Sequence, residues 1–194
     1  MKTGYKAGKN FKVGLYCIID EDVEIGDDVT IGNYVMLKNG TRISNRVNMA
    51  DYCCTTGLCY IGNDVNIRTR STISMGVIVE DRAFVGAGVM TSHTKNIYHQ
   101  RPMMVQKQLI TKIGMGSVIG SSSNLRAGVN IGPSVIIGYD SNVCGDCLMP
   151  GVYFGNPAKK VGPLPPTMVV EVPSGWEPYK FPEEMLKKYL SHAS

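Results

Sequence analysis

The apolar residues of this chain recur every six positions over most of its length. From Val13 onward, thirteen positions spaced six residues apart are aliphatic with the exception of Thr55, and the period resumes at Ile113 for seven more. The fourth residue after each of these twenty positions is small or β-branched except at the last, Tyr153. A six-residue period is too short for a helix pair or a propeller blade, and it suits one short strand followed by a bend.

Three such strands make one triangular coil, and successive coils stack about 4.8 Å apart through parallel backbone pairing. Twenty hexads, with a possible further one at Thr91, predict about seven coils. The aliphatic residues are expected to point inward, with the small residues near the corners. Glycine follows the aliphatic residue in nine of the twenty hexads, and we attribute this to the backbone conformation that a bend requires. The pattern therefore predicts an all-β parallel β-helix.

The repeat is interrupted once, between Thr91 and Ile113. The interval of 22 residues is not a multiple of six, so one hexad leaves 16 residues that must project from the prism as a loop near 92–112. Long loops in compact folds are usually functional or disordered. This one contains His93, His99 and the apolar run Met103–Val105. It also carries four Lys and Arg residues and no acidic residue, so the charge of this segment equals the net charge of the whole chain, +4.

Charge and composition exclude several classes of partner. The mild positive charge lacks the aromatic-interleaved basic runs of nucleic-acid-binding proteins. Apolar runs of the length that a membrane span requires do not occur, and the basic N-terminus is not followed by an apolar stretch. We therefore expect a cytoplasmic protein without nucleic-acid or membrane partners.

The six cysteines are best explained by the repeat. Four of them occupy the small inward position: Cys17, Cys53, Cys59 and Cys147. Cys144 and Cys147 form a Cys-x-x-Cys pair, but they straddle a hexad and lack a second pair or a nearby histidine. We interpret them as structural thiols, with a redox or metal role as the alternative.

Residues 163–194 lie outside the repeat and form a Pro-rich extension to the 1–162 domain. Residues 167–172 have the composition of an edge strand. Pro182 is expected to begin a short helix with Glu183 and Glu184 at its start, lysines 187 and 188 at its end, and an apolar stripe formed by residues 185, 186, 189 and 190. We expect this segment to pack against the prism or a neighbour rather than to have a separate function.

The repeat ends in Gly155-Asn156-Pro157-Ala158-Lys159, which is similar to the closing motif of the hexapeptide-repeat acyltransferase superfamily. Together with the hexads, the resemblance covers residues 13–162 and includes sugar and nucleotide-sugar acetyltransferases. It implies a left-handed parallel β-helix of about seven coils with an ejected loop near 92–112 and a short C-terminal helix. It also implies homotrimers with active sites in the clefts between subunits.

The same resemblance suggests site residues. A histidine near the start of the ejected loop acts as general base in many members, which implies that role for His93. The coenzyme A positions of the family correspond here to Gly120, Ser121, Tyr139, Asn156, Lys159 and Lys160. The match is incomplete, because Ser92 precedes the histidine where members have Asn or Gly. Cys144-Gly-Asp also stands in place of Thr-Lys-Asp, and Tyr139 occupies a usually small position beside the pantetheine arm.

The sequence thus predicts an acetyl-CoA-dependent acetyltransferase that acts on a hydroxyl or amine of a sugar or nucleotide-linked sugar, in surface polysaccharide biosynthesis. A neutral histidine suits the proton transfer that acyl transfer requires at pH 7. Two alternatives remain open. One is a γ-type carbonic anhydrase, which needs three zinc-binding histidines on the same fold. The other is a non-catalytic β-helix scaffold.

Overall fold

A computed structural model describes residues 4–96, 99–101, 103 and 109–191, with side chains to residue 187 at the C-terminal end. Met104, Val105 and Lys107, which belong to the loop near 92–112, lie outside the described residues, as does the third histidine of the chain, His192. So do the side chains at positions 188, 189 and 190, on which part of the predicted helix stripe depends.

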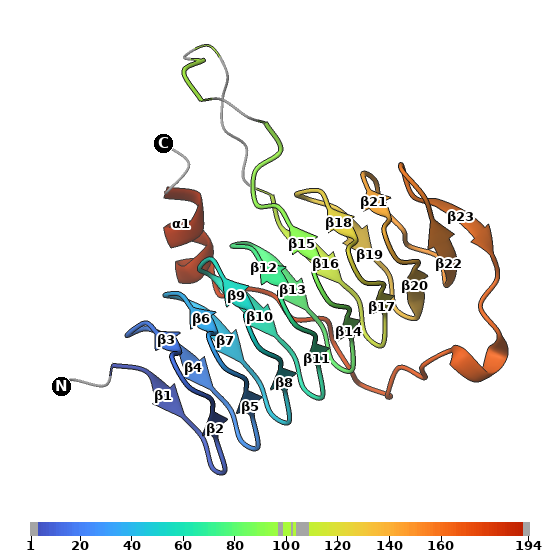
Figure 1. Cartoon of the computed structure of the whole chain (residues 1–194). Helices are drawn as coiled ribbons and strands as arrows, with labels where there is room; N and C mark the ends of the chain where they lie inside the picture. The colour runs from blue at the N-terminus through green and yellow to red at the C-terminus, as the bar shows by residue number, and fades with distance from the viewer. Residues whose placement is uncertain (1–3, 97–98, 102, 104–108, 192–194) are drawn as a thin grey trace.

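The strands form three sheets that are the faces of a triangular prism (Figure 1). Sheet A contains β1 (Lys6–Ala7), β4 (Glu24–Ile25), β7 (Thr41–Ile43), β10 (Cys59–Ile61), β13 (Val77–Val79), β16 (Thr111–Ile113) and β19 (Asn130–Ile131). Sheet B contains β2 (Lys12–Val13), β5 (Thr30–Ile31), β8 (Asn48–Met49), β11 (Asn66–Ile67), β14 (Phe84–Val85), β17 (Val118–Ile119), β20 (Val135–Ile137), β22 (Gly151–Phe154) and β23 (Lys159–Gly162). Sheet C contains β3 (Ile18–Ile19), β6 (Met36–Leu37), β9 (Cys54–Thr55), β12 (Thr72–Ile73), β15 (Met90–Thr91), β18 (Asn124–Leu125) and β21 (Asn142–Val143).

Strands β1 to β21 make seven complete coils, and β22 begins an eighth that the antiparallel β23 ends. The predicted left-handed parallel β-helix of about seven coils is confirmed. Each regular coil is three hexads long, so that Lys6 pairs with Glu24 and Asn48 pairs with Asn66. We call the turns between sheets A and B the AB corner, and we name the BC and CA corners in the same way.

The hexad aliphatics fill the prism, as predicted. Leu37, Ile61, Ile67 and Ile119, among others, are completely inaccessible to solvent and form one continuous core. The last hexad differs because its coil is shorter: Val135 pairs with Gly151, where a coil of three hexads would place Tyr153. Tyr153 therefore lies opposite Ile137 and is buried, while Met149, predicted to point inward, is exposed.

The reason we gave for the repeated glycines is wrong. The left-handed backbone occurs two residues later in the turn, for example at Tyr34 with φ 57°. The glycine that follows the aliphatic residue is required by stacking. A Cβ atom on Gly114 would lie 2.6 Å from the carbonyl carbon of Gly132 in the next coil. The close approach of coil backbones, rather than an unusual φ, therefore selects glycine.

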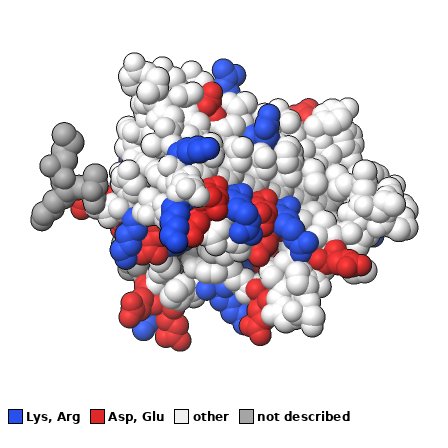
Figure 2. Space-filling view, turned by 90° about the horizontal axis from the view of Figure 1, so that it is seen from below, with Lys and Arg blue, Asp and Glu red and all other residues white. Residues whose placement is uncertain are grey.

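Opposite charges alternate along the AB corner. Arg46 donates two hydrogen bonds to the carboxylate of Asp64, at 2.7 and 2.8 Å, and this guanidinium lowers the pKa of Asp64. Figure 2 views this side of the prism and shows Lys or Arg next to Asp or Glu in a row. Exposed pairs of this kind add little stability, and their charges largely cancel.

The C-terminal extension returns along sheet A toward the first coils (Figure 1). Val170 exchanges two hydrogen bonds with Ser134, and Tyr179 stacks on Tyr60 with ring centroids 3.6 Å apart. Phe181 is buried in a cluster that includes residues 58 and 78. The extension therefore packs against the prism, as predicted, and it covers the outer surface of sheet A.

The helix prediction for this extension is confirmed, but the strand prediction is wrong. The helix α1 (Glu183–Ser191) begins directly after Pro182. Residues 167–172 form no strand: a 3₁₀ turn occupies Pro166–Met168, and the backbone that follows bonds the side chains of Ser134 and Arg82 rather than another strand. Over the described residues, no helix reaches the length and apolarity that a membrane crossing requires.

Glu80 is a buried acid at the AB corner, where neighbouring coils have glycine. It is 5% exposed and accepts the backbone N–H of Met115 at 3.1 Å. Burial raises the pKa of Glu80 above its ordinary 4.5, with Asp81 adding to the rise while Met115 and Lys112 oppose it. The carboxyl group of Glu80 therefore binds its proton more tightly in the folded protein than in the unfolded chain. The stability that Glu80 contributes is largest below pH 4.5 and is lost as the pH rises.

We expect Glu80→Gln to raise the melting temperature at pH 7, because it removes the buried charge and keeps a carbonyl acceptor for Met115. The difference from the wild type should shrink toward pH 4, where Glu80 is protonated in both states. Melting curves between pH 4 and 8 measure this. A Glu80→Gln protein that melts lower at pH 7 and equally at pH 4 would contradict the assignment.

Candidate functional site

The predicted loop leaves the prism at the CA corner of the fifth coil. A coil of three hexads would pair Val77 with Lys95, but Val77 pairs with Thr111. The chain therefore has an insertion of 16 residues, the distance from Lys95 to Thr111. This insertion has the length that the interrupted period predicts. The described parts of the loop rise away from the prism (Figure 1), with the side chains of Lys95 and Arg101 exposed.

Two buried threonines hold the ends of the loop. Thr91, 3% exposed, accepts the backbone N–H of Ser74 at 2.7 Å and donates to the carbonyl of Thr72 at 3.0 Å. Thr111 is fully buried and accepts the N–H of Gly128 at 2.9 Å. Because both hydroxyls satisfy backbone groups of neighbouring turns, the loop starts and ends at fixed points.

His93 is the second residue after β15. Ser92 still donates its N–H to the carbonyl of Leu125 at 3.0 Å, so His93 lies directly after the last bond of the regular coil. Its side chain is partly buried, whereas that of His99, farther along the loop, is exposed. The anchored start of the loop therefore positions His93 and leaves His99 at the surface.

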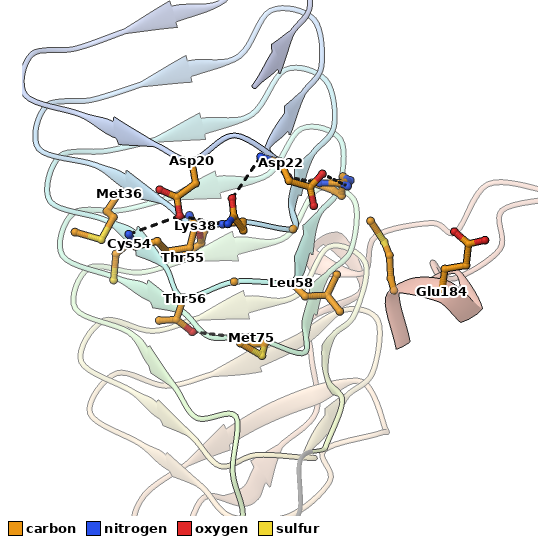
Figure 3. A pocket seen from close by; sticks show the side chains of 15 residues that line it. Asp20, Asp22, Met36, Lys38, Cys54, Thr55, Thr56, Leu58, Met75 and Glu184 are labelled. Atoms are coloured by element: carbon orange, nitrogen blue, oxygen red, sulfur yellow. Dashed lines mark hydrogen bonds and ion pairs between the residues drawn. The ribbon is translucent and has the colours of Figure 1, made fainter. Parts of the chain in front are cut away.

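A cavity of about 650 Å³ follows the same corner on the N-terminal side of His93. Its walls are the CA turns of the first four coils and the helix α1, which stands opposite these turns in Figure 3. Met75 lines its end, in the turn that Ser74 joins to Thr91. The coil of Met75 is next to that of His93, roughly 5 Å away. The lining residues are Asp20, Asp22, Met36, Lys38, Asn39, Gly40, Arg42, Cys54, Thr55, Thr56, Gly57, Leu58, Met75, Glu184 and Met185.

Ion pairs occupy the rim of this cavity. The Lys38 ammonium lies 3.6 Å from Asp20, with both side chains partly exposed. Arg42 contacts the carboxylates of Asp22 at 3.0 Å and Glu24 at 3.3 Å, and its side chain is 16% exposed. The cavity therefore offers hydrogen-bond donors and acceptors beside an apolar surface, with most of its charge balanced.

The six-residue pattern did not predict this cavity, although one exception in the pattern lies in its lining. Thr55 is the only non-aliphatic residue among the first thirteen hexad positions. It lines the cavity, hydrogen-bonds the hydroxyl of Thr41 at 2.7 Å and accepts the N–H of Lys38 at 3.0 Å. A hydroxyl at a core position requires partners, so the exception in the repeat indicated a polar corner.

Three of the residues predicted to bind coenzyme A, Gly120, Ser121 and Tyr139, lie at the BC corner. Gly120 approaches Tyr139 so closely that a Cβ atom on Gly120 would overlap the backbone nitrogen of Tyr139. Ser121 accepts the N–H of Asp140 at 2.8 Å through its carbonyl. Tyr139 is 69% exposed and packs edge-on against Phe154, 5.5 Å between centroids. Its ring therefore points outward and leaves the backbone of Gly120 and Ser121 accessible along the corner.

The structure separates the two predicted lysines. Asn156 lies in the exposed turn between β22 and β23, next to the same corner. Lys159 pairs with the exposed Phe154, and Lys160 pairs with the buried Tyr153. Paired residues of antiparallel strands point to the same side. Lys159 is thus on the outer surface beside Phe154, while Lys160 lies toward the open end of the prism, over Gly151.

His93 and the BC corner lie on opposite edges of sheet C. Leu125, whose carbonyl bonds Ser92, is at the end of β18, and Ser121 precedes that strand. Six residues separate Ser121 from the level of His93, and because Ser122 has a left-handed backbone with φ 60°, the separation is shorter than the roughly 20 Å of a fully extended chain. One prism therefore does not bring the predicted base and the predicted coenzyme A residues together.

The cysteines occupy the places expected of structural thiols. Cys53, Cys59 and Cys147 are buried, and burial raises the pKa of their thiols to about 11, about 12 and about 11 respectively. Cys144 is exposed, and all six are free. Within the described part of the chain, no three His, Cys, Asp or Glu side chains gather as a metal site requires. Thiols with raised pKa values are poor nucleophiles at pH 7.

Comparison with known proteins supports the fold. No family model and no curated protein matches the chain. A UDP-N-acetylglucosamine acyltransferase from Campylobacter jejuni superposes with a TM-score of 0.60 at 14% identity, covering 82% of this chain and 71% of that one. A mutant of AntD, an N-acyltransferase from Bacillus cereus in complex with dTDP and coenzyme A, gives 0.52 at 15% identity, covering 95% and 92%. The chain thus shares the left-handed β-helix fold of hexapeptide-repeat acyltransferases.

Proposed function

We propose that this protein transfers an acetyl group from acetyl-CoA to a hydroxyl or amine of a sugar, free or nucleotide-linked. The observation that carries the proposal is the position of His93, fixed at the start of the ejected loop and one coil from the end of a 650 Å³ cavity. Two proteins of the same fold are described as acyltransferases, one of them with coenzyme A bound.

In the proposed acyl transfer, His93 acts as the general base. Its imidazole accepts the proton of the acceptor hydroxyl or amine while the oxygen or nitrogen attacks the thioester carbonyl. The new C–O or C–N bond forms, the C–S bond breaks, and the proton passes to the sulfur of the leaving coenzyme A. Backbone N–H groups at the corner would stabilise the negative charge on the carbonyl oxygen.

The separation of His93 from the BC corner favours a site shared between copies. Within one prism the two lie on opposite edges of sheet C. Because the C-terminal extension covers sheet A, sheets B and C and their shared BC corner remain available for contact with another copy. A homotrimer in which the loop of one copy reaches the BC corner of the next would unite them, and a monomer at micromolar concentration in light scattering would contradict this arrangement.

The residues at the BC corner are of the types that could bind coenzyme A. The exposed rings of Tyr139 and Phe154 offer an apolar surface beside the turn at Asn156, and Lys159 supplies a positive charge for phosphate. Surface polysaccharide biosynthesis in the cytoplasm is the corresponding cellular role that we propose.

The two lysines provide a matched test of this assignment. We expect Lys159→Ala to weaken acetyl-CoA binding at least about tenfold, because a charge-assisted hydrogen bond contributes about 1.5–3 kcal/mol. Lys160→Ala should change the affinity less than twofold, since Lys160 points toward the prism end. Calorimetric titration of both variants measures this. Equal effects of the two substitutions would contradict the proposed binding surface.

The function itself is tested by thiol release. Incubation with acetyl-CoA and a panel of sugars, amino sugars and nucleotide-linked sugars should release free coenzyme A with at least one acceptor. Failure of the folded protein to bind acetyl-CoA, together with the absence of thiol release, would favour the scaffold alternative and end the proposal.

A further inference from the structure

The lining of the cavity at the CA corner indicates which class of acceptor molecule it could bind. This inference rests on the acyltransferase function proposed above. Its size lies within the usual range for small-molecule sites, roughly 300–1,000 Å³. It is formed by turns that the core holds in place and by α1, whose Met185 contributes to the opposite wall. Both walls belong to the same chain.

The apolar part of the lining is a thioether and leucine surface. Met36 lines it from strand β6, Met75 from a turn and Met185 from α1, together with the nearly buried Leu58. Methionine side chains are flexible and polarisable, and they adapt to irregular apolar surfaces. This part of the cavity suits the C–H face of a pyranose ring.

The polar part offers donors and acceptors in close alternation. Lys38 lies 3.6 Å from Asp20 Oδ2, which also accepts the N–H of Asn39 at 3.3 Å. The ammonium keeps further donors for a ligand, and the Oδ1 atom of Asp20 can accept from it. The partly exposed side chains confirm that solvent reaches both. A vicinal pair of sugar hydroxyls can accept from the ammonium and donate to the carboxylate at the same time.

The charge of the lining does not suit a phosphate group. Among its described residues, three carboxylates (Asp20, Asp22 and Glu184) stand against two cations. Arg42 is held by Asp22 and Glu24, and it also donates to the carbonyl of Asp22 at 2.6 Å. A diphosphate would therefore enter a site of net negative charge whose guanidinium is already bonded, and like charges in close proximity cost several kcal/mol.

We propose that this cavity is the acceptor site and that its ligand is a sugar or amino sugar without a phosphate group. The ring would lie on Met75 and Leu58, its hydroxyls would contact Lys38 and Asp20, and its reacting group would point along the corner toward His93. The proposal thus selects the free sugar over the nucleotide-linked one.

Kinetics with matched acceptors test the choice. A free amino sugar should have a kcat/KM at least about tenfold higher than its nucleotide-linked counterpart, the size of one lost ionic contact. Asp20→Asn should raise KM for the free sugar about tenfold and leave kcat within about twofold, because it alters binding and not proton transfer. A preference for the nucleotide-linked sugar would overturn the proposal.

Asp27→Asn is the control. Asp27 lies at the AB corner and accepts the N–H of Lys9 at 2.7 Å, and the equivalent residues of the next two coils are already asparagine, Asn45 and Asn63. Its KM should equal that of the wild type. Equal KM values for Asp20→Asn and Asp27→Asn would also overturn the assignment of the cavity.

A binding measurement separates this inference from the enzymatic proposal. Saturation-transfer NMR with the wild type and a free amino sugar, without acetyl-CoA, should show contact that Asp20→Asn and Met185→Ala weaken and Asp27→Asn does not. Sugar contact without thiol release would end the acyltransferase proposal and keep the cavity assignment. Thiol release without sugar contact at this cavity would do the reverse.

Discussion

Replacement of His93 by alanine is expected to slow acyl transfer at least a hundredfold while the protein remains as stable as the wild type. General-base catalysis contributes about 10²–10⁴ to a rate, and a hundredfold loss corresponds to about 2.7 kcal/mol of transition-state stabilisation. Stability should not change, because the loop is anchored by Thr91 and Thr111 rather than by His93. Thiol-release kinetics and melting curves measure the two quantities.

His99→Ala is the matched control within the same loop. Its side chain is exposed, and the hydrogen bond that Arg101 makes there goes to the carbonyl of His99, which alanine retains. The variant should turn over within about twofold of the wild type, as surface substitutions commonly do. A His93→Ala enzyme with an unchanged rate would remove His93 from the mechanism, and an equally impaired His99→Ala enzyme would point to the loop as a whole.

The prism was predictable because its core is periodic. A parallel β-helix places the same positions of every six-residue repeat inside, so Ile61, Ile67 and Ile73 are related by spacing alone, and all are completely buried. The loop length followed from the same count. The prediction failed where the period itself changes: the shortened coil before β22 moves Tyr153 into the place expected from Met149.

The cavity was not predictable because a distant segment completes it. Its turn side has only Thr55 as a sequence signal, while Met185 arrives from an extension that runs back along sheet A. The contacts that fix this path follow no repeat, and one of them, the stacking of Tyr179 on Tyr60, joins residues more than a hundred positions apart. The separation of Lys159 from Lys160 depends on the antiparallel pairing of β23, which the closing motif alone does not specify.

Substitution of Gly114 by alanine is expected to destabilise the fold by about 3 kcal/mol, at the upper end of the usual cost of overpacking. The added Cβ would lie 2.6–2.7 Å from backbone atoms of the next coil: the Gly132 carbonyl carbon, the Ile131 oxygen and the Pro133 nitrogen. The Gly114 N–H also bonds the Ile131 carbonyl at 2.9 Å. Relief of the overlap therefore requires the two coils to separate and the bond to lengthen.

Gly145→Ala isolates this effect. A Cβ atom on Gly145 would meet nothing within 4 Å, because the prism ends there. Both substitutions restrict the unfolded chain equally. The difference in stability between the two variants therefore measures the cost of the overlap between stacked coils. For a chain of this size, about 3 kcal/mol corresponds to a melting temperature lower by about 6–12 °C, whereas Gly145→Ala should melt close to the wild type. Equal melting temperatures for the two variants would mean that the coils tolerate a side chain between them, and close stacking would no longer explain why glycine follows the aliphatic residue in so many hexads.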